Sequence, residues 1–334
     1  MIEQLRRFTY ARQMLGRSAA GPAEALRAVA GVYSSHPSGP LSLSARSKSF
    51  SAKAYEELDH VRVPAFRGSI HIVAPESAEL ALGLTKETEK QRDYRLKYMG
   101  FTRAQYEDLK PKIRKAAQNP RTAAELREDV GLEKRVSAVL GGMNREGLLV
   151  RVGSANLRSN ALRYQAARLK PAAKEKSHEW AAGEYLRAFG PARVRDFAWW
   201  APASAREAAA AFDAHGAIDV GEGYFLRPED RDAFEGAQAV RGDRVDVIPK
   251  WDCLTMGYPK DGRERFLHPE LYDRAYDFRG DGRGLMLAAG QAVGAWEGRF
   301  GSKPGIELDW FEKPGAKLKA AVEKGFDEVR ALLS

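Results

Sequence analysis

The chain has 334 residues, 44% of them hydrophobic, and a formal net charge of +9 at pH 7. This length allows two or three domains with substantial cores, and the lack of any apolar run of about 18 residues excludes a membrane-spanning helix. The single cysteine, Cys253, excludes an internal disulfide. Because the first residues also lack the apolar segment of a secretory signal, we expect a cytoplasmic protein.

The first repeat, residues 1–75, is predicted to contain a helix pair followed by a strand. Pro22 to Val32 reads as one helix and Ser51 to His60 as a second, and the segment 65–73 ends in a strand with alternating side chains. A helix pair followed by short strands is the order of a winged helix, whose second helix is built to lie in a DNA groove.

The second repeat, residues 76–170, shows this order most clearly. Thr122 is a predicted helix cap, Leu132 to Glu146 carries apolar residues at helical spacing, and Gly147 closes that helix. Two strands, 148–152 and 162–165, then frame a tip rich in Gly, Ser and Asn, which is typical of a hairpin. We expect this hairpin to be the wing.

A third repeat, residues 171–236, has helices at 178–189 and 204–215 and a hairpin turn at 221–223. Residues 237–334 contain several short strands with glycine turns, followed by a helix at 315–333 that presents one apolar stripe. The predicted fold class is therefore α+β: tandem winged helices followed by a small β-rich, barrel-like domain.

Charge divides the chain unevenly. Residues 1–170 contain 30 Lys and Arg against 17 Asp and Glu, a net charge of +13, whereas residues 171–334 carry −4. An excess of this size is typical of a protein that binds a polyanion, because each neutralised phosphate releases counterions. We expect the first two repeats to grip double-stranded DNA and the acidic third repeat to act as a scaffold. The alternative is an ordinary solvated surface.

Candidate DNA-contacting residues follow from this placement. Lys134, Arg135 and Arg145 fall on the predicted recognition helix of the second repeat, while Arg151, Arg158 and Arg163 fall on its wing. The basic stretch 86–115 either lines a groove or forms a charged face with internal ion pairs, and the sequence leaves both open.

Other chemistries lack a local signature. The six histidines are scattered, with no pair four residues apart and no cysteine cluster, so we expect no metal. The glycine-rich segment 280–284 follows no buried strand and precedes no helix, which favours a hairpin turn over a phosphate-binding loop. We therefore expect no cofactor and no bound nucleotide.

Four segments in a fixed order carry a resemblance to a known family. They are Leu15-Gly16 with 29–32 and Pro37, Arg67 to Val73, Tyr185 to Phe197, and Val247 to Tyr258 with 293–296. Together with the tandem repeats, they make nearly the whole chain resemble the bacterial AlkZ-like winged-helix DNA glycosylases. The resemblance implies hydrolysis of the N-glycosidic bond of alkylated bases, in some members of interstrand crosslinks. It also implies damaged double-stranded DNA as the partner.

The resemblance also implies a catalytic Gln-x-Gln in the first winged helix, before an acidic residue and a proline. The matching stretch here is Gly31 to Pro37, so Tyr33 and Ser35 stand where the glutamines are expected. Neither side chain has the paired donor and acceptor of a carboxamide. His36 either acts as a general base that orients water, or caps a helix or contacts phosphate.

Four further residues are candidates for the same cleft. Arg67 and His71 lie in the family's strand segment, where His71 either faces the cleft or is a hydrogen-bonded core residue. Trp251 either stacks on a base or fills the core, and Asp252 contacts DNA or orients a turn. Two hypotheses remain: a glycosylase with altered water-positioning residues, or a non-catalytic DNA-binding protein that keeps the scaffold.

Overall fold

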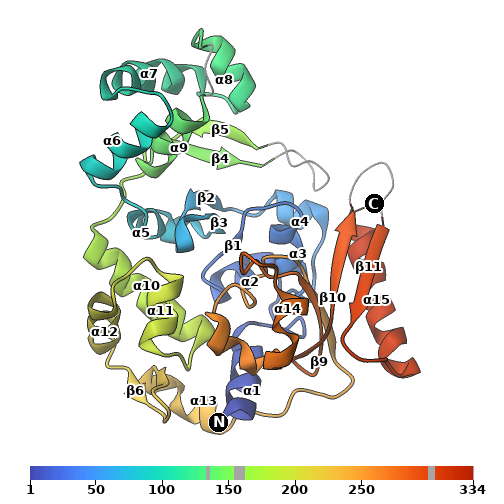
Figure 1. Ribbon diagram of the computed structural model, residues 1–334. Coiled ribbons are helices and arrows are strands. Elements are labelled where there is room, and N and C mark those ends of the chain that lie inside the picture. The colour runs from blue at the N-terminus through green and yellow to red at the C-terminus, as the bar shows by residue number, and fades with distance from the viewer. Residues whose placement is uncertain (133–135, 154–161, 300–304, 334) are drawn as a thin grey trace.

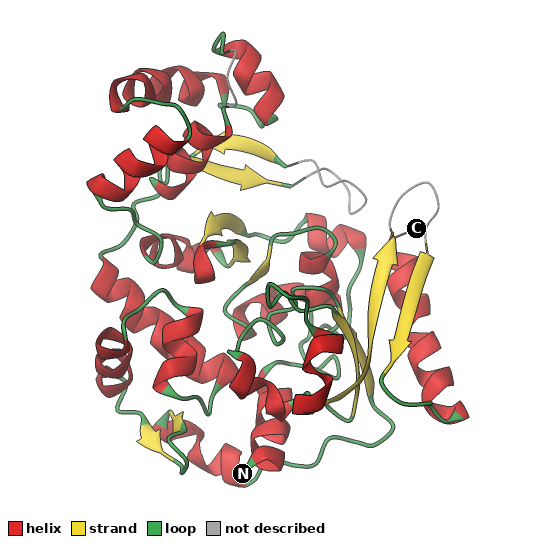
Figure 2. Ribbon diagram, viewed as in Figure 1, coloured by secondary structure: helices red, strands yellow, loops and turns green. Residues whose placement is uncertain are grey.

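The computed structural model describes residues 1–132, 136–153, 162–299 and 305–333 (Figure 1). Helices alternate along the chain with the strands of three antiparallel sheets (Figure 2). This mixed helix-and-sheet architecture confirms the predicted α+β class. Within the described residues, no helix combines the length and apolar character that crossing a bilayer demands.

One order of elements occurs three times: a helix, a short strand, two helices and a hairpin, with the short strand pairing to the last strand of its hairpin. In the first repeat these are α2 (Pro22–Ala28), β1 (Val32–Tyr33), α3 (Ser38–Ser44), α4 (Ala52–Glu56), β2 (Val61–Pro64) and β3 (Ile70–Val73).

The later repeats reduce the short strand to a single bridge. The second repeat has α7 (Arg103–Ala116), the bridge Arg121–Tyr164, α8 (Ala123–Asp129), α9 (Ser137–Arg145), β4 (Leu149–Val152) and β5 (Arg163–Ala166). The third has α10 (Lys174–Phe189), the bridge Ala192–Phe225, α11 (Val194–Trp200), α12 (Ala205–Ala214), β6 (Ile218–Asp219) and β7 (Phe225–Leu226).

Local sequence sets where several of these helices begin. Before α8, the Thr122 hydroxyl accepts from the backbone N–H of Glu125 at 3.2 Å, and the Glu125 carboxylate accepts from the Thr122 N–H. Ser204 and Glu207 form the same reciprocal box before α12. Each box satisfies two N–H groups that the first turn of a helix leaves without partners.

The first repeat differs most from the expected helices. The predicted helix from Pro22 to Val32 ends at Ala28, because Gly31 adopts φ +121° and turns the chain into β1. A Cβ at Gly31 would lie 2.9 Å from the Ile72 carbonyl oxygen, so only glycine lets the chain pass this close to β3. The helix α3 was not expected. In the second repeat the predicted helix 132–146 is shorter, since α9 begins at Ser137.

The hairpins of the first two repeats join in one five-stranded sheet. Its order is β1-β3-β2-β4-β5, and β2 meets β4 where Arg62 pairs with Arg151. Two helices connect the repeats, α5 (Ala78–Gly83) and α6 (Glu89–Tyr98). In Figure 1 the second repeat lies above β2 and β3. The sheet therefore crosses the domain boundary expected at residue 75.

Packing groups the repeats differently from their order. The second repeat has its own core, which includes Leu96, Tyr106 and Leu140. The first and third repeats share the main core, where the rings of Phe66 and Trp200 stack at 3.7 Å. The third repeat thus supports the first from below, as its position in Figure 1 shows.

The C-terminal part is a four-stranded antiparallel sheet of consecutive strands, covered by the last helix. Trp296 and Phe326 pack edge to face at 5.3 Å in the core between them. The elements are β8 (Val245–Ile248), β9 (Gly284–Ala288), β10 (Gln291–Arg299), β11 (Gly305–Trp310) and α15 (Ala316–Leu333). Ala289 and Gly290 connect β9 to β10 as a hairpin, one of the glycine turns that the sequence predicts in this part.

Short helices fill the remaining described chain. The N-terminal α1 (Ile2–Arg12) packs against α10, α13 and η4. The others are α13 (Arg231–Glu235), α14 (Tyr272–Ala275) and the 3₁₀ turns η1 (Phe66–Gly68), η2 (Pro75–Ser77), η3 (Pro228–Asp230), η4 (Lys260–Arg265) and η5 (Pro269–Leu271).

Candidate active site

A cavity of about 720 Å³ opens where the first repeat, the second repeat and the C-terminal part meet. The first repeat supplies Tyr33, Ser34, Ser35, His36, Pro64 and residues 67–70; the second supplies Gly141, Asn144, Arg145, Arg151 and Leu162; the C-terminal part supplies Trp251, Met256 and Asp281. Residues from three distant stretches of sequence therefore share one space, and its volume suits a small organic group such as a base.

The segment 33–36 forms the floor where the resemblance expects the catalytic motif. Tyr33 ends β1 opposite His71, with ring centroids 4.3 Å apart. Burial raises the pKa of Tyr33 to about 12, so the phenol is a neutral hydroxyl at pH 7. The chain then leaves the sheet through Ser34, whose N–H donates to the Ile70 carbonyl at 3.0 Å.

Two polar atoms on this floor have no hydrogen-bond partner among the described residues: Ser34 Oγ and His36 Nε2. Burial lowers the pKa of His36 below its ordinary value of 6.5, so the imidazole is neutral at pH 7. Burying a polar atom without a hydrogen-bond partner costs about 1–3 kcal/mol of folding free energy. Such atoms are often found where a ligand or a water molecule binds.

Arg67 and Trp251 both line the cavity and share an unusual backbone conformation. Both are non-glycine residues in the left-handed region, with φ +53° and +56°. Such conformations cost about 1–3 kcal/mol and concentrate at functional sites. The Arg67 guanidinium stacks on Trp199 at 3.8 Å, and its Nη1 has no hydrogen-bond partner among the described residues. It therefore offers a positive charge to the cavity.

The second repeat contributes an amide and two further cations. Asn144 donates through Nδ2 to the Leu149 carbonyl at 2.8 Å, which leaves its buried Oδ1 without a partner within the described chain. The Arg151 guanidinium lies 5.5 Å from the Tyr164 ring, and its Nε likewise lacks a partner there. Arg145 Nε lies 3.6 Å from the Glu87 carboxylate oxygen Oε1. The second repeat thus brings an amide and two arginines to the lining of the cavity.

Asp281 is the acidic residue that sequence reasoning missed. It is the only Asp or Glu among the described lining residues, and its charge acts on both Tyr33 and Arg67. Its local sequence is a glycine turn with no catalytic signature, and only tertiary packing brings it to residues 33–36. Asn144 was missed for the same reason, whereas Ser34 lies inside the motif stretch but between the two positions expected to hold glutamine.

The predicted site residues separate into groups. The cavity brings together Tyr33, Ser35, His36, Arg67, Arg145, Arg151 and Trp251. Arg163 is exposed on β5 and does not line the cavity. Lys134, Arg135 and Arg158 lie outside the described residues.

His71 and Asp252 lie behind the cavity in the core. His71 is buried, its Nδ1 is 3.1 Å from the Ser69 carbonyl oxygen, and burial lowers its pKa to about 4. Asp252 is fully buried, and its two carboxylate oxygens accept from Arg46 at 2.7 and 2.8 Å. A carboxylate enclosed by Arg46 and Ser42 faces no solvent, which favours the structural alternative for Asp252 over a DNA contact.

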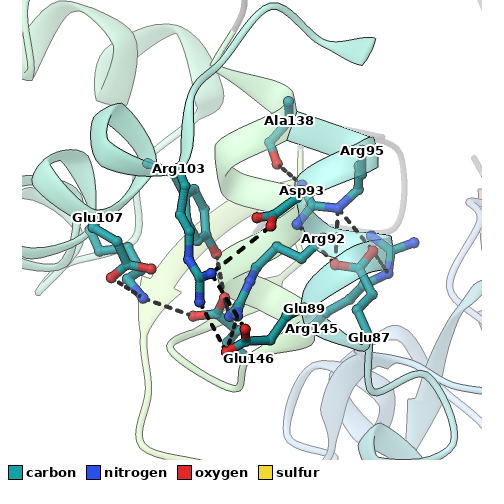
Figure 3. A network of polar contacts seen from close by, with 12 residues as sticks. Glu87, Glu89, Arg92, Asp93, Arg95, Arg103, Glu107, Ala138, Arg145 and Glu146 are labelled. Atoms are coloured by element: carbon teal, nitrogen blue, oxygen red, sulfur yellow. Dashed lines mark hydrogen bonds and ion pairs between the residues drawn. The ribbon is translucent and has the colours of Figure 1, made fainter. Parts of the chain in front are cut away.

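The basic stretch 86–115 forms a polar network with α9 (Figure 3). Of the two alternatives that the sequence left open, the contacts favour the one with internal ion pairs. Arg95 makes a two-pronged contact with Glu87 at 2.9 and 3.0 Å and donates to the Ala138 carbonyl. Glu146 accepts from Arg92, Tyr106 and Lys110. These cations are therefore committed to holding α6, α7 and α9 together, whereas exposed Lys90 and Lys97 are not buried in the network.

Comparison with known proteins decides the family. The family model described as "DNA glycosylase AlkZ-like" matches residues 26–332. The chain belongs to the AlkZ-like DNA glycosylase family. The described fold is similar to that of the Streptomyces sahachiroi DNA glycosylase AlkZ, with a TM-score of 0.75 and 18% sequence identity over 97% of this chain and 94% of that one. No curated protein sequence matches.

Membership of this family agrees with the chemistry of the cavity. No group of three or more His, Cys, Asp or Glu side chains in the described parts of the chain is arranged to hold a metal ion. What the cavity offers instead is neutral hydroxyl, imidazole and amide groups, one carboxylate and three arginines. Such a set can hold a water molecule and a polar base close to a DNA backbone.

Proposed function

We propose that this protein is a monofunctional DNA glycosylase that hydrolyses the N-glycosidic bond of N-alkylated bases in duplex DNA. The observation that carries the proposal is the cavity itself. Its lining includes the segment 33–36, where the resemblance expects the catalytic motif, and its polar atoms include Ser34 Oγ and His36 Nε2, which have no partner in the described chain. The cytoplasm, where chromosomal DNA is accessible, is the location that fits this substrate.

The reaction needs a positioned water and a proton acceptor. The hydroxyls of Tyr33 and Ser35 hold the water, whose oxygen attacks C1′ of the damaged nucleotide. The C1′–N bond breaks, and its electron pair leaves with the base, which becomes neutral when it carried an alkyl-induced positive charge. The proton of the water passes to His36 Nε2 or to the Asp281 carboxylate. A cationic leaving group makes this modest machinery sufficient.

We propose that the three repeats are winged helices and that the first two of them hold the DNA. Arg145 and Arg151 at the cavity are suited to the phosphates that flank the damaged nucleotide, because guanidinium groups pair with phosphate oxygens in two-pronged geometry. Lys134, Arg135, Arg158 and Arg163 remain predicted contacts farther along the duplex. Arg67 and Trp251 would contact the base, by charge and by stacking.

A second candidate function rests on the two replaced glutamines. Tyr33 and Ser35 each offer a single hydroxyl, and the Tyr33 ring is also held against His71. A carboxamide presents a donor and an acceptor together, which neither hydroxyl reproduces. This difference favours a DNA-binding protein that keeps the glycosylase scaffold without its chemistry.

Base release separates the two functions. Duplexes that carry a single N-alkylated purine, or an interstrand crosslink, are incubated with wild type and with Ser35→Ala, His36→Ala and Asp281→Asn. We expect wild type to release the base, with losses of about 10²–10⁴-fold for the variant that lacks the proton acceptor. Arg206→Ala, on the exposed surface of α12, is a matched control that should retain full activity.

Duplex affinity is measured on the same samples. Tight duplex binding without base release from any substrate would favour the non-catalytic function. Base release at the wild-type rate in both His36→Ala and Asp281→Asn would exclude both residues as proton acceptors.

A further inference from the structure

Phe278 is the most solvent-exposed large hydrophobic side chain of the described chain, with 92% of its surface accessible. An isolated exposed apolar residue is normal on a protein surface. A whole benzyl group left in water forgoes the stabilisation that its burial would bring. Whether the exposure of Phe278 indicates a function therefore depends on how the side chain is held and on what lies next to it.

A tight turn, residues 277–281, holds Phe278 at its tip. The Asp277 carboxylate accepts from the backbone N–H groups of Arg279 and Asp281 at 2.9 and 3.0 Å. The backbone N–H of Asp277 donates to the Asp281 carbonyl at 3.1 Å, and Gly280 closes the turn with φ +81°. The tip is thus fixed by several hydrogen bonds, so the phenyl ring is presented by an ordered turn.

The base of this turn is part of the cavity wall. Asp281 lines the cavity, and the next residue, Gly282, accepts the backbone N–H of Trp251 at 3.1 Å. On the other side, Tyr276 is buried and donates through its hydroxyl to the Thr255 carbonyl at 2.8 Å. Phe278 is three positions before Asp281, so even a fully extended chain would place the two residues no more than about 11 Å apart, and the tight turn brings them closer.

One cation lies beside the exposed ring, and a second lies beside Trp251 in the cavity lining. The Arg279 guanidinium is 5.1 Å from the centre of the Phe278 ring, and the Lys250 ammonium is 4.7 Å from the centre of the Trp251 ring. An aromatic side chain next to a cation can stack on a base while the cation contacts a neighbouring phosphate.

A base inside a duplex cannot reach the cavity unless it leaves the stack. Enzymes that act on bases rotate the nucleotide out of the helix, and apolar side chains inserted between base steps help to cover the unstacking cost. We propose that Phe278 is such a wedge: it enters the base stack beside the nucleotide whose base occupies the cavity. This inference rests on the duplex binding of the proposed function and not on its catalysis.

A binding experiment tests the wedge without any need for base release. The probes are one duplex with a single tetrahydrofuran abasic analogue and the same duplex intact. A wedge gains more from the abasic duplex, because the gap there is already open. We expect wild type to bind the abasic duplex more tightly, and Phe278→Ala to lower that affinity by about 5- to 150-fold with little effect on the intact duplex.

Two further variants make the test specific. Phe278→Leu keeps an apolar wedge and should retain most of the preference for the abasic duplex. Tyr94→Ala removes another exposed aromatic side chain, on α6, and should leave the preference unchanged. Unchanged thermal unfolding midpoints establish that each variant is folded.

The outcomes distinguish the two proposals. A wild-type preference that persists in Phe278→Ala, or no preference in wild type, overturns the wedge while duplex binding stands. Wild-type protein that binds neither duplex overturns the proposed function and the wedge with it.

Discussion

At the scale of single residues, Asp252 and Arg46 form the most enclosed ion pair of the described chain. Neither side chain has accessible surface. Besides its two contacts with Arg46, the carboxylate accepts from the Ser42 hydroxyl at 2.7 Å and the Leu254 N–H at 2.9 Å. Every lone pair is therefore used, which is the condition under which a buried pair is tolerated.

Removing the charge of Asp252 should destabilise the protein strongly. Asp252→Asn leaves the Arg46 guanidinium buried without its counter-charge, and we expect the free energy of unfolding to fall by about 3–5 kcal/mol. Denaturant unfolding of wild type and variant measures this difference in the free energy of unfolding. Asp261→Asn is the control, because Asp261 is half-exposed and pairs with Arg193 at the surface, where a pair contributes about 0–1 kcal/mol. Equal losses in both variants would contradict the role given to Asp252.

His71 makes stability depend on pH. Burial holds its pKa at about 4 in the folded protein, below the ordinary value of 6.5. The unfolded chain therefore binds a proton more readily, so the contribution of His71 is fully present above about pH 6.5 and is lost as the pH falls toward 4.

The change between pH 7 and pH 5 should be about 2 kcal/mol. His71→Asn keeps a donor near the position of Nδ1 but does not titrate in this range. Urea unfolding at both pH values should show that wild type loses about 2 kcal/mol more than the variant. Parallel losses in the two proteins would mean that His71 is accessible to protons in the folded state.

At the scale of elements, local sequence predicted what depends on neighbouring residues. The predicted cap at Thr122 depends on side chains within a few positions and is present, whereas the predicted helix over residues 22–32 ran past the end of α2 at Ala28. The pairing of β2 with β4 could not be predicted, because it joins residues 62 and 151 through a single register contact. Strand pairing at such separation depends on how whole repeats pack.

The candidate site divides in the same way. Tyr33, Ser35 and His36 were found because a contiguous motif carries them. Asp281 was not, since the segment 280–284 reads only as a turn; in the structure the turn covers residues 277–281, and β9 begins at Gly284. Its place in the cavity depends on Gly282 accepting the Trp251 N–H, a contact between residues 31 positions apart that leaves no periodic trace in the sequence.

The network of α6, α7 and α9 gives an element-scale prediction. Arg95 is mostly buried and binds both Glu87 and the Ala138 carbonyl, and Gly142 on α9 leaves the space that it occupies. Arg95→Ala should lower the free energy of unfolding by about 2–4 kcal/mol, because it removes charge-assisted hydrogen bonds and leaves Glu87 with fewer partners.

Lys97→Ala on the same helix is the matched control. Lys97 is exposed, so its loss should change stability by no more than about 0.5 kcal/mol. Thermal and denaturant unfolding measure both. A similar, small effect for Arg95→Ala would show that the network contributes charge to the surface and little to the packing of the three helices.

At the scale of the whole molecule, charge and packing both distinguish the first two repeats, which we expect to bind DNA, from the third repeat, which supports the first. The net charge of +13 lies in residues 1–170, and the acidic remainder of the chain includes the third repeat. That third repeat shares its core with the first, so it supports the cavity floor from behind. We therefore expect the duplex to run along the first two repeats and the C-terminal part, over the mouth of the cavity.

Matched charge reversals test this path. Arg163 on β5 and Arg206 on α12 are both exposed, and each reversal to Glu changes the net charge by the same amount. A plot of log affinity for an undamaged duplex against log salt concentration has a slope of about −0.9 for each phosphate neutralised.

We expect Arg163→Glu to weaken binding at low salt and to make the slope shallower by about one, because it removes a phosphate contact from the path. Arg206→Glu should leave the slope unchanged and lower the affinity only slightly, through long-range repulsion that salt screens. If the two reversals reduce slope and affinity equally, the duplex follows the net charge of the molecule and the path along the first two repeats is wrong.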